Sequence, residues 1–428
     1  MPATVESLFA ERTKWMRASD VREILKYAEM PGIISLGGGL PSPDSFPLED
    51  LAVIFEELLK EKNASAFQYG PTPGDARLRT ALVERLKTRG VAVETEGVIV
   101  THGAQQAIEL LGRVLLDPGD TVVTTEPTYL GIFTALATYR PSYHGIRMDD
   151  EGLLTDVLED DLRSLDRKGV RPKFLYVVPT FHNPAGVTMS ARRRRRLADL
   201  ATEYRVLVVE DDPYYDLRFE GEDLPPVASL DKEGWVISVG SFSKILAPGF
   251  RVGWAAGHPD VIGKMSLAKQ GVDLFTNSFG QRVAERYLRL GMLDRHLPQV
   301  RAMYRRKRDL MLAAMEEHFP EGVSWTRPQG GMFLWVTLPS GVDTRPLLPR
   351  AAERGVVFVP GHGFFPGPPE ANHMRLNYSY PSEADIPRAI EALGGVLTEA
   401  TGPMAAPAVG RASSARAPRP PRPRRPRC

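Results

Sequence analysis

Residues 241–254 are Ser-Phe-Ser-Lys-Ile-Leu-Ala-Pro-Gly-Phe-Arg-Val-Gly-Trp, and they follow an apolar run at 235–239 that is typical of a buried strand. The stretch carries two hydroxyls, Ser241 and Ser243, an amine, Lys244, and a guanidinium, Arg251, within eleven residues. Hydroxyls and a guanidinium suit a phosphate. A lysine at a strand end, among donors that disfavour its charged form, suits a Schiff base. Together they predict a pyridoxal 5'-phosphate site; the alternative is a surface lysine beside a loop arginine.

Apolar runs alternate with helix-like stretches along most of the chain. Strand candidates are residues 97–101, 121–125, 173–178, 206–210 and 235–239, and helix candidates include 104–116, 190–203 and 297–318. This alternation predicts an α/β fold with a mostly parallel central sheet covered on both faces, a three-layer sandwich. Ligands of such sheets bind beyond the carboxyl ends of the strands. The polar residues that follow these runs are therefore the candidate site residues.

The composition indicates a globular enzyme with an unusual tail. The chain has 428 residues, of which 43% are hydrophobic, enough for a large core. Its formal net charge is +1, but residues 401–428 hold seven arginines, seven prolines and no acidic residue, which leaves 47 basic against 53 acidic residues elsewhere. A net charge of −6 for that remainder gives no sign of nucleic-acid binding. The tail itself is expected to be disordered and dispensable, with a role at a nucleic acid or a membrane surface as the alternative.

Targeting signals and disulfides are not expected. The N-terminus lacks the basic and apolar regions of a signal peptide, and no apolar stretch is long enough to span a bilayer. The single cysteine is Cys428, so a disulfide framework is impossible. We expect a cytoplasmic enzyme with no membrane partner. Five consecutive arginines, at 192–196 behind a Ser190 N-cap, are expected to form a solvated helix face, with binding of an anionic partner as the alternative.

Two further strand ends suit the phosphate and the ring of this cofactor. The run at 97–101 leads into a helix start with small residues, where backbone N–H groups can approach a phosphate; the candidates there are Gly103, Ala104 and Gln105. The run at 206–210 ends in Asp211, a candidate to keep a pyridine nitrogen protonated, with Asp212 as the competing choice. Tyr214 can hydrogen-bond the ring's phenolic oxygen. A metal site here lacks nearby His or Cys partners, so no metal is expected.

Three more residues follow strand candidates. Asn183, after the run at 173–178, offers an amide donor to the same phenolic oxygen, although an ordinary Asn-Pro turn is the alternative. Its neighbour His182 is expected to be structural. Tyr129, after the run at 121–125, can stack on a flat ring or belong to the core.

Arg375 lies inside an apolar, strand-like run, Met374-Arg-Leu-Asn-Tyr-Ser379. An unpaired buried guanidinium is costly, so Arg375 needs an anionic partner. That partner is either a protein carboxylate or the α-carboxylate of a substrate held by two hydrogen bonds.

These residues carry a family resemblance over residues 15–397. The motifs, in order, are Tyr69-Gly, Gly103-Ala-Gln-Gln, Tyr129, Asn183-Pro-Ala-Gly, Asp211-Asp-Pro-Tyr214, Ser241-x-Ser-Lys244, Arg251-x-Gly-Trp254, Gly330-Gly-Met-Phe-Leu-Trp and Arg375. The series resembles the class I/II, fold-type I pyridoxal-phosphate aminotransferases. The resemblance implies a large cofactor-binding domain at 51–295 and a smaller α+β domain from an N-terminal segment at 1–50 and a C-terminal one at 296–400, before the tail at 401–428.

The N-terminal part resembles the 2-aminoadipate and kynurenine aminotransferase subgroup. It carries Arg17-Ala-Ser19-Asp-Val-Arg22-Glu and then Ile34-Ser-Leu-Gly-Gly-Gly39-Leu-Pro. The match implies that an early helix and its glycine-rich loop fold over the substrate, with Gly39 close to it and Ser19 or Arg22 reading its side chain. It also implies a homodimer in which Tyr69 reaches the phosphate of the neighbouring subunit. His182 departs from the family, because relatives commonly carry Gln or another residue there.

The resemblance implies transamination by a ping-pong mechanism. A 2-aminoadipate, aromatic, branched or long-chain amino acid would give its amino group to a 2-oxo acid such as 2-oxoglutarate. Lys244 would carry the cofactor and act as base and then as acid. Two rival functions stay open at this point: another reaction on the same fold (β-lyase, decarboxylase or racemase), and a non-catalytic effector sensor.

Overall fold

The computed structural model describes residues 4–16, 30–61 and 64–402. Its main sheet has the strand order β2 (Val98–Thr101), β9 (Gly253–Ala256), β8 (Val236–Ser241), β7 (Leu207–Asp211), β6 (Phe174–Val177), β3 (Thr121–Glu126), β4 (Ser142–Asp149) and β5 (Gly152–Leu153). Strands β8, β7, β6, β3 and β4 are mutually parallel, β9 is antiparallel to both its neighbours, and β5 is antiparallel to β4. The prediction of an α/β fold with a mostly parallel sheet is confirmed, and all five predicted strands are present.

Helices cover both faces of this sheet. Successive strand residues point to opposite faces, so Val208 and Val209 of β7 belong to different apolar clusters. The cluster with Val208 includes Leu158 of α6 (Thr155–Arg167) and Leu197 of α7 (Ala191–Tyr204). The cluster on the other face includes residues of α4 (Gly103–Leu115), α5 (Gly131–Leu136) and α8 (Pro259–Gln270). The sheet is thus the middle of three layers.

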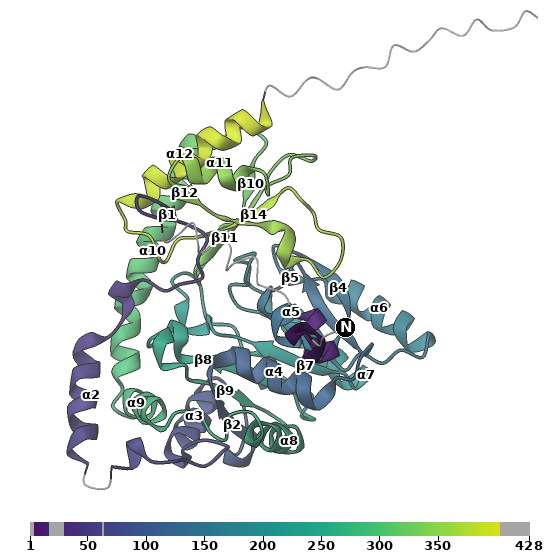
Figure 1. Ribbon diagram of the computed structural model, residues 1–428, viewed down its shortest axis with the longest axis vertical. Helices are drawn as coiled ribbons and strands as arrows, with labels where there is room; N and C mark the ends of the chain where they lie inside the picture. Colours follow the sequence, from purple (N-terminus) through teal and green to yellow (C-terminus); the bar gives the residue numbers. More distant parts are fainter. Residues whose placement is uncertain (1–3, 17–29, 62–63, 403–428) are drawn as a thin grey trace, which may run out of the picture.

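Two smaller sheets lie at one end of the molecule (Figure 1). An antiparallel sheet has the order β10 (Ser324–Trp325), β11 (Phe333–Thr337), β14 (His373–Asn377) and β13 (Val359–Pro360). Strand β1 (Ile34–Ser35) pairs in parallel with β12 (Val356–Val357), which joins an N-terminal segment to a C-terminal one. The helices beside these sheets are α10 (Met292–His318), α11 (Leu347–Glu353) and α12 (Asp385–Thr401). The exact domain boundaries stay a prediction.

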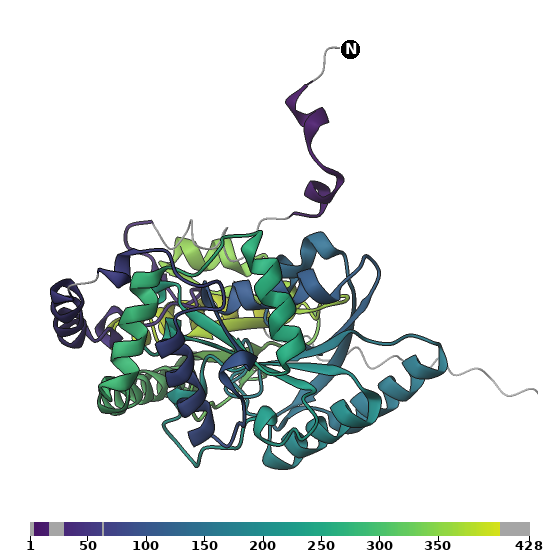
Figure 2. The same ribbon diagram turned by 90° about the horizontal axis from the view of Figure 1, so that it is seen from below.

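The remaining helices pack at the edge of the main sheet that β2 and β9 form. Helices α2 (Leu48–Lys60), α3 (Ala76–Thr88) and α9 (Ser278–Arg289) share an apolar cluster with β2 and β9. Short 3-10 helices occur at Val5–Leu8, Glu11–Trp15, Pro43–Ser45, Ser65–Phe67, Thr95–Gly97, Ala137–Tyr139, Tyr215–Leu217, Val227–Ser229, Phe242–Lys244, Pro248–Phe250 and Gly361–Phe364. In Figure 2 the segment with residues 4–16 stands away from the rest of the chain. Its Trp15 contacts the main body through a cation–π interaction with the guanidinium of Arg140.

The prediction for the arginine run is wrong in part. Helix α7 begins at Ala191, behind Ser190 as expected, but the Ser190 side chain makes no capping hydrogen bond. Arg193 and Arg194 are buried rather than solvated. Arg193 pairs with Asp149, and Arg194 donates to the carbonyls of Met189 and Pro179. Oxygen acceptors around both guanidinium groups compensate for their removal from water, which is why these two arginines can be buried.

Within the described ranges, no helix is both long and apolar enough to cross a membrane. The tail at 403–428, like Ser19 and Arg22, lies outside the described residues, so the predictions for them stay predictions.

Candidate active site

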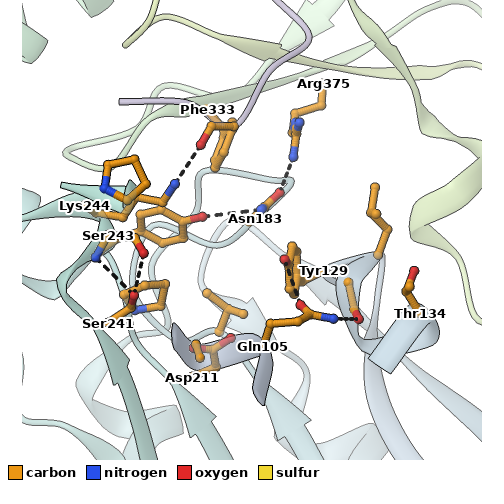
Figure 3. Close-up of a pocket in the computed structure, with 18 of the residues that line it drawn as sticks. Gln105, Tyr129, Thr134, Asn183, Asp211, Ser241, Ser243, Lys244, Phe333 and Arg375 are labelled. Carbon is orange, nitrogen blue, oxygen red and sulfur yellow. Dashed lines mark hydrogen bonds between the residues drawn. The ribbon is translucent and has the colours of Figure 1, made fainter. Parts of the chain in front are cut away.

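One cavity, of about 380 Å³, collects most of the residues that the sequence predicts for the site (Figure 3). It lies where β7 and β8 end and α4 begins, beside β11 and β14 of the smaller sheet. The predicted residues that line it are Gly39, Ala104, Gln105, Tyr129, Asn183, Asp211, Tyr214, Ser241, Ser243, Lys244, Arg251 and Arg375. Parallel strands end at one edge of a sheet, which is why residues far apart in sequence meet here.

At one end of the cavity, a cation meets the start of a helix. Arg251 donates from Nη2 to the carbonyl of His102, at 3.3 Å, and from Nη1 to Oγ of Ser243, at 3.5 Å. Gly103, the first residue of α4, has a φ of +75°, and a Cβ there would lie 2.7 Å from Nη2 of Arg251. A helix N-terminus carries partial positive charge, so a guanidinium beside it is favourable only with an anion between them. The Oγ atoms of Ser241 and Ser243, 2.9 Å apart, add hydroxyl donors to this anion site.

A carboxylate ends β7 and faces the cavity. Oδ2 of Asp211 accepts a hydrogen bond of 2.6 Å from the phenol of Tyr176, while the buried Oδ1 has no partner among the described residues. Burial raises the pKa of Asp211 to about 6, and the bond from Tyr176 acts in the opposite direction. Asp212, the competing choice, does not line the cavity; its Oδ2 accepts from Thr180 instead. The geometry therefore favours Asp211 as the carboxylate that meets a ligand.

Lys244 ends the 3-10 helix Phe242–Lys244 and projects into the same space. Its Nζ donates to the carbonyl of Gly39, at 2.7 Å. Burial lowers its pKa to about 8, and the nearby charges of Arg375 and Arg251 act in the same direction. An amine with such a pKa is uncharged far more often near neutral pH than an exposed lysine.

Arg375 of β14 is buried without a carboxylate among the described residues. Its Nη1 donates to Oδ1 of Asn183 and its Nη2 to the carbonyl of Gly37, both at 2.8 Å. Its guanidinium lies over the rings of Phe333 and Phe364. Burial lowers its pKa to about 10. Of the two partners that the sequence allows, the structure thus supplies no protein carboxylate, and an incoming one would meet an unbalanced cation.

Two tyrosines and an amide complete the wall. Nδ2 of Asn183 donates to the phenolic oxygen of Tyr214, at 3.4 Å. Tyr129 donates to Oε1 of Gln105, at 3.4 Å, and Gln105 donates in turn to the carbonyl of Gly131. Burial raises the pKa of Tyr129 and of Tyr214, so both phenols stay protonated.

Comparisons with known proteins decide the family. A family model described as aminotransferase class I and II matches residues 32–393. The chain belongs to this family. An aromatic-amino-acid aminotransferase of Thermococcus litoralis is 46% identical over 395 residues, which is 92% of this chain and 95% of that one.

Solved aminotransferases have the same fold. A kynurenine aminotransferase of Pyrococcus horikoshii, in complex with PMP, has a TM-score of 0.89 at 48% identity and covers 92% of this chain and 98% of its own. An α-aminoadipate aminotransferase of Thermus thermophilus, complexed with N-(5'-phosphopyridoxyl)-L-leucine, has a TM-score of 0.85 at 38% identity, with coverages of 93% and 99%. The chain is therefore a pyridoxal-phosphate-dependent aminotransferase, and it acts on amino acids.

The cavity of this aminotransferase fits the cofactor on its own geometry. It offers hydroxyl, guanidinium and helix-start donors at one end and an unpartnered carboxylate oxygen, Oδ1 of Asp211, further in. Oδ1 of Asp212 is also buried without a partner among the described residues, but only Asp211 lines the cavity, where a bound ligand can supply the missing partner.

Some predicted residues lie elsewhere. Tyr69 is 78% exposed and outside the cavity lining. His182 is buried, accepts from the backbone N–H of Ala185 at Nδ1, and contacts Oγ1 of Thr125 with Nε2. Burial lowers its pKa to about 3, so it is a neutral structural residue of the turn.

Sequence reasoning missed several residues that surround the site. Phe333 and Tyr176 contact Arg375 and Asp211 but lie inside apolar runs, where an aromatic residue is most often core. Phe333 belongs to the quoted motif Gly330-Gly-Met-Phe-Leu-Trp, which was the one available signal. The other lining residues without a prediction are Leu130, Gly131, Thr134, Val178, Pro213 and Pro248.

Proposed function

We propose that this aminotransferase moves the amino group of an acidic, aromatic or long-chain α-amino acid to 2-oxoglutarate by a ping-pong mechanism. The observation that carries the proposal is Arg375: a buried guanidinium, without a carboxylate among the described residues, in the same cavity as Lys244. Every α-amino acid and every 2-oxo acid brings a carboxylate that can form two parallel hydrogen bonds with such a group. One site can then serve both half-reactions in turn.

The residues around the cavity suit the parts of the cofactor. Pyridoxal phosphate, when bound, supplies a protonated ring that accepts the electrons of the substrate's Cα–H bond. Ser241, Ser243, Arg251 and the start of α4 would hold its phosphate, and Tyr129 would stack on its ring. Its ring nitrogen would meet Oδ1 of Asp211. The phenolic oxygen would accept from Asn183 and Tyr214, whose side chains already contact each other.

Lys244 would hold the cofactor and move the proton. A pKa of about 8 leaves roughly a tenth of such amines uncharged at pH 7, against about one in three thousand at the ordinary value of 10.5. The freed amine can therefore take the proton from the substrate Cα and later give it up again, as base and then as acid. The two arginines that lower this pKa, Arg375 and Arg251, are those that would bind the substrate carboxylate and the phosphate.

We also propose an oligomeric state, a cellular location and a division into domains. The chain forms a homodimer in which Tyr69 reaches the partner's phosphate site, and its 78% exposure leaves the phenol available for that contact. The enzyme works in the cytoplasm. Its large domain spans 51–295 and its smaller one joins 1–50 to 296–400, a division that the pairing of β1 with β12 supports.

The amino donor is proposed from the relatives, which are named for aromatic amino acids, kynurenine and aminoadipate. Gly39 lines the cavity, while Ser19 and Arg22, proposed to read the substrate side chain, lie outside the described residues. A screen of 2-aminoadipate, phenylalanine, tyrosine, kynurenine and leucine against 2-oxoglutarate tests this. Glutamate formed in equal amount to the donor consumed supports transamination, and release of ammonia, carbon dioxide or racemised donor contradicts it.

Covalent labelling tests the role of Lys244. Borohydride treatment of the loaded enzyme should fix a pyridoxyl group on Lys244, and peptide mass analysis should locate it there. Lys244→Ala should lose at least the roughly 10²–10⁴-fold that a positioned acid–base group contributes. Lys264→Ala, at an exposed position of α8, is the control and should keep both label and activity. A label on any other lysine would refute the assignment.

A further inference from the structure

The carboxylate at the end of β7 is held by a phenol from the neighbouring strand. Tyr176 lies on β6, paired with Val209 of β7, and its Oη donates to Oδ2 of Asp211 over 2.6 Å. Both side chains are buried, and Tyr176 is fully so. Because burial and the adjacent carboxylate both raise the pKa of Tyr176, its phenol keeps its proton and can only be the donor.

We propose that Tyr176 is a positioning residue, whose phenol occupies Oδ2 of Asp211 so that Oδ1 alone is presented to the ring nitrogen of the cofactor. The inference rests on the proposed function, in which Asp211 pairs with that nitrogen. A carboxylate with one oxygen fixed by a short hydrogen bond cannot rotate its second oxygen away from the ligand. The second oxygen is Oδ1, which has no partner among the described residues although it is buried.

The neighbouring carboxylate has the same pattern of contacts but a different position, since its Oδ1 is also buried without a partner among the described residues yet faces no cavity. Oδ2 of Asp212 accepts from Oγ1 of Thr180, at 2.8 Å, and Asp212 does not line the cavity. Each acid of the Asp211-Asp212 pair thus has its own hydroxyl donor from a different part of the chain. The donor on Asp211 comes from a strand of the sheet itself, and so has a rigid backbone behind it.

The phenol also controls where the proton lies. Burial raises the pKa of Asp211 to about 6, and the hydrogen bond from Tyr176 counteracts that rise. Without the phenol the carboxylate becomes more basic and competes more strongly for the proton that it shares with the ring nitrogen. Loss of Tyr176 should therefore move that proton from the ring toward Asp211, which a purely structural residue would not do.

The test is Tyr176→Phe, reconstituted with pyridoxal phosphate labelled with ¹⁵N in the ring. The ¹⁵N chemical shift, followed against pH, reports whether the ring nitrogen is protonated. We expect the ¹⁵N shift of the variant to lie closer to that of an unprotonated ring nitrogen than the wild-type shift does at the same pH, and its apoenzyme to bind the cofactor roughly 10- to 100-fold more weakly, the size expected for a hydrogen bond to a charged group. Tyr378→Phe is the matched control, because it removes another buried phenolic bond, of 2.7 Å to the carbonyl of Gly330.

A second variant covers the case in which Tyr176→Phe does not fold. Replacement of Tyr176 by 3-fluorotyrosine keeps the bond but makes its donor more acidic, so the ¹⁵N shift should move toward that of a protonated ring nitrogen. An unchanged ¹⁵N titration in both variants would overturn the inference. Asp211→Asn separates this outcome from failure of the proposed function: if it leaves the ¹⁵N titration unchanged, Asp211 itself is not the partner of the ring nitrogen.

Discussion

Replacement of Arg375 by alanine should weaken every amino donor to the same extent. The pKa of this guanidinium falls from its ordinary value of 12.5 to about 10, chiefly because the side chain is buried, with an exposed fraction of only 3%. That difference corresponds to a cost of about 3 kcal/mol for holding the charged form in this site at neutral pH. A substrate carboxylate removes this cost by supplying the missing charge. We therefore expect kcat/KM to fall roughly 200-fold in Arg375→Ala, within the ~2–5 kcal/mol typical of a broken buried charge pair.

The assay compares one acidic and one aromatic donor, glutamate and phenylalanine, in single half-reactions followed by cofactor absorbance. Arg375→Lys keeps the charge but loses the planar fork, so it should recover only part of the loss. Arg327→Ala is the control for an exposed arginine, whose pairing with Glu316 is a surface contact worth little. Thermal unfolding of each variant shows whether the fold is kept. A loss confined to one donor would refute the reasoning, because the α-carboxylate is common to both.

Asp211→Asn should bind the cofactor yet lose about 10²–10³-fold in turnover, whereas Asp212→Asn should keep most of its activity; the reverse order of steady-state rates would show that the other carboxylate serves the ring. Tyr69→Ala and Lys244→Ala, each impaired alone, should recover about a quarter of wild-type activity when refolded together, because one of the two sites of a mixed dimer is then intact. No recovery would argue against a shared site. Arg22→Ala should weaken glutamate and 2-aminoadipate but spare phenylalanine, and a uniform kcat/KM loss would contradict a role in side-chain recognition.

The fold could be predicted from the sequence wherever a local pattern carries it. Apolar runs bounded by polar residues gave β3, β6, β7 and β8 to within a residue or two at each end. Long-range pairings left no such trace. The two-residue strands β1 and β12 pair across more than three hundred residues of sequence, and each is too short to show a period. The antiparallel setting of β9 between β2 and β8 likewise depends on tertiary packing.

The candidate site could be predicted where its residues are polar and follow a strand. Lys244, Asp211 and Asn183 were found in this way, and the structure brings them into one cavity. Residues that act from within a strand were not found. Tyr176 is an aromatic residue in an apolar strand, so in the sequence it looks like any core residue. Only its hydrogen bond to Asp211, seen in the structure, distinguishes it from the core. The arginine run gave the opposite error, because its charges predicted a solvated face although Arg193 and Arg194 are buried. The sequence alone does not show where a buried guanidinium will find hydrogen-bond acceptors.

Burial disfavours the charged form of three ionisable groups that face this cavity, Lys244, Arg375 and Asp211. Burial lowers the pKa of Lys244 to about 8 and that of Arg375 to about 10, and it raises that of Asp211 to about 6. In each case the charged form is the one disfavoured, because solvent has been removed before a counter-charge is supplied. In the proposed function the ligands would bring charges for two of these groups, a carboxylate for Arg375 and a protonated ring nitrogen for Asp211. Lys244 would need no counter-charge, because an amine attacks an aldehyde in its uncharged form. The protein thus holds the cost of desolvation in the site, and binding of cofactor and substrate relieves it where the chemistry takes place.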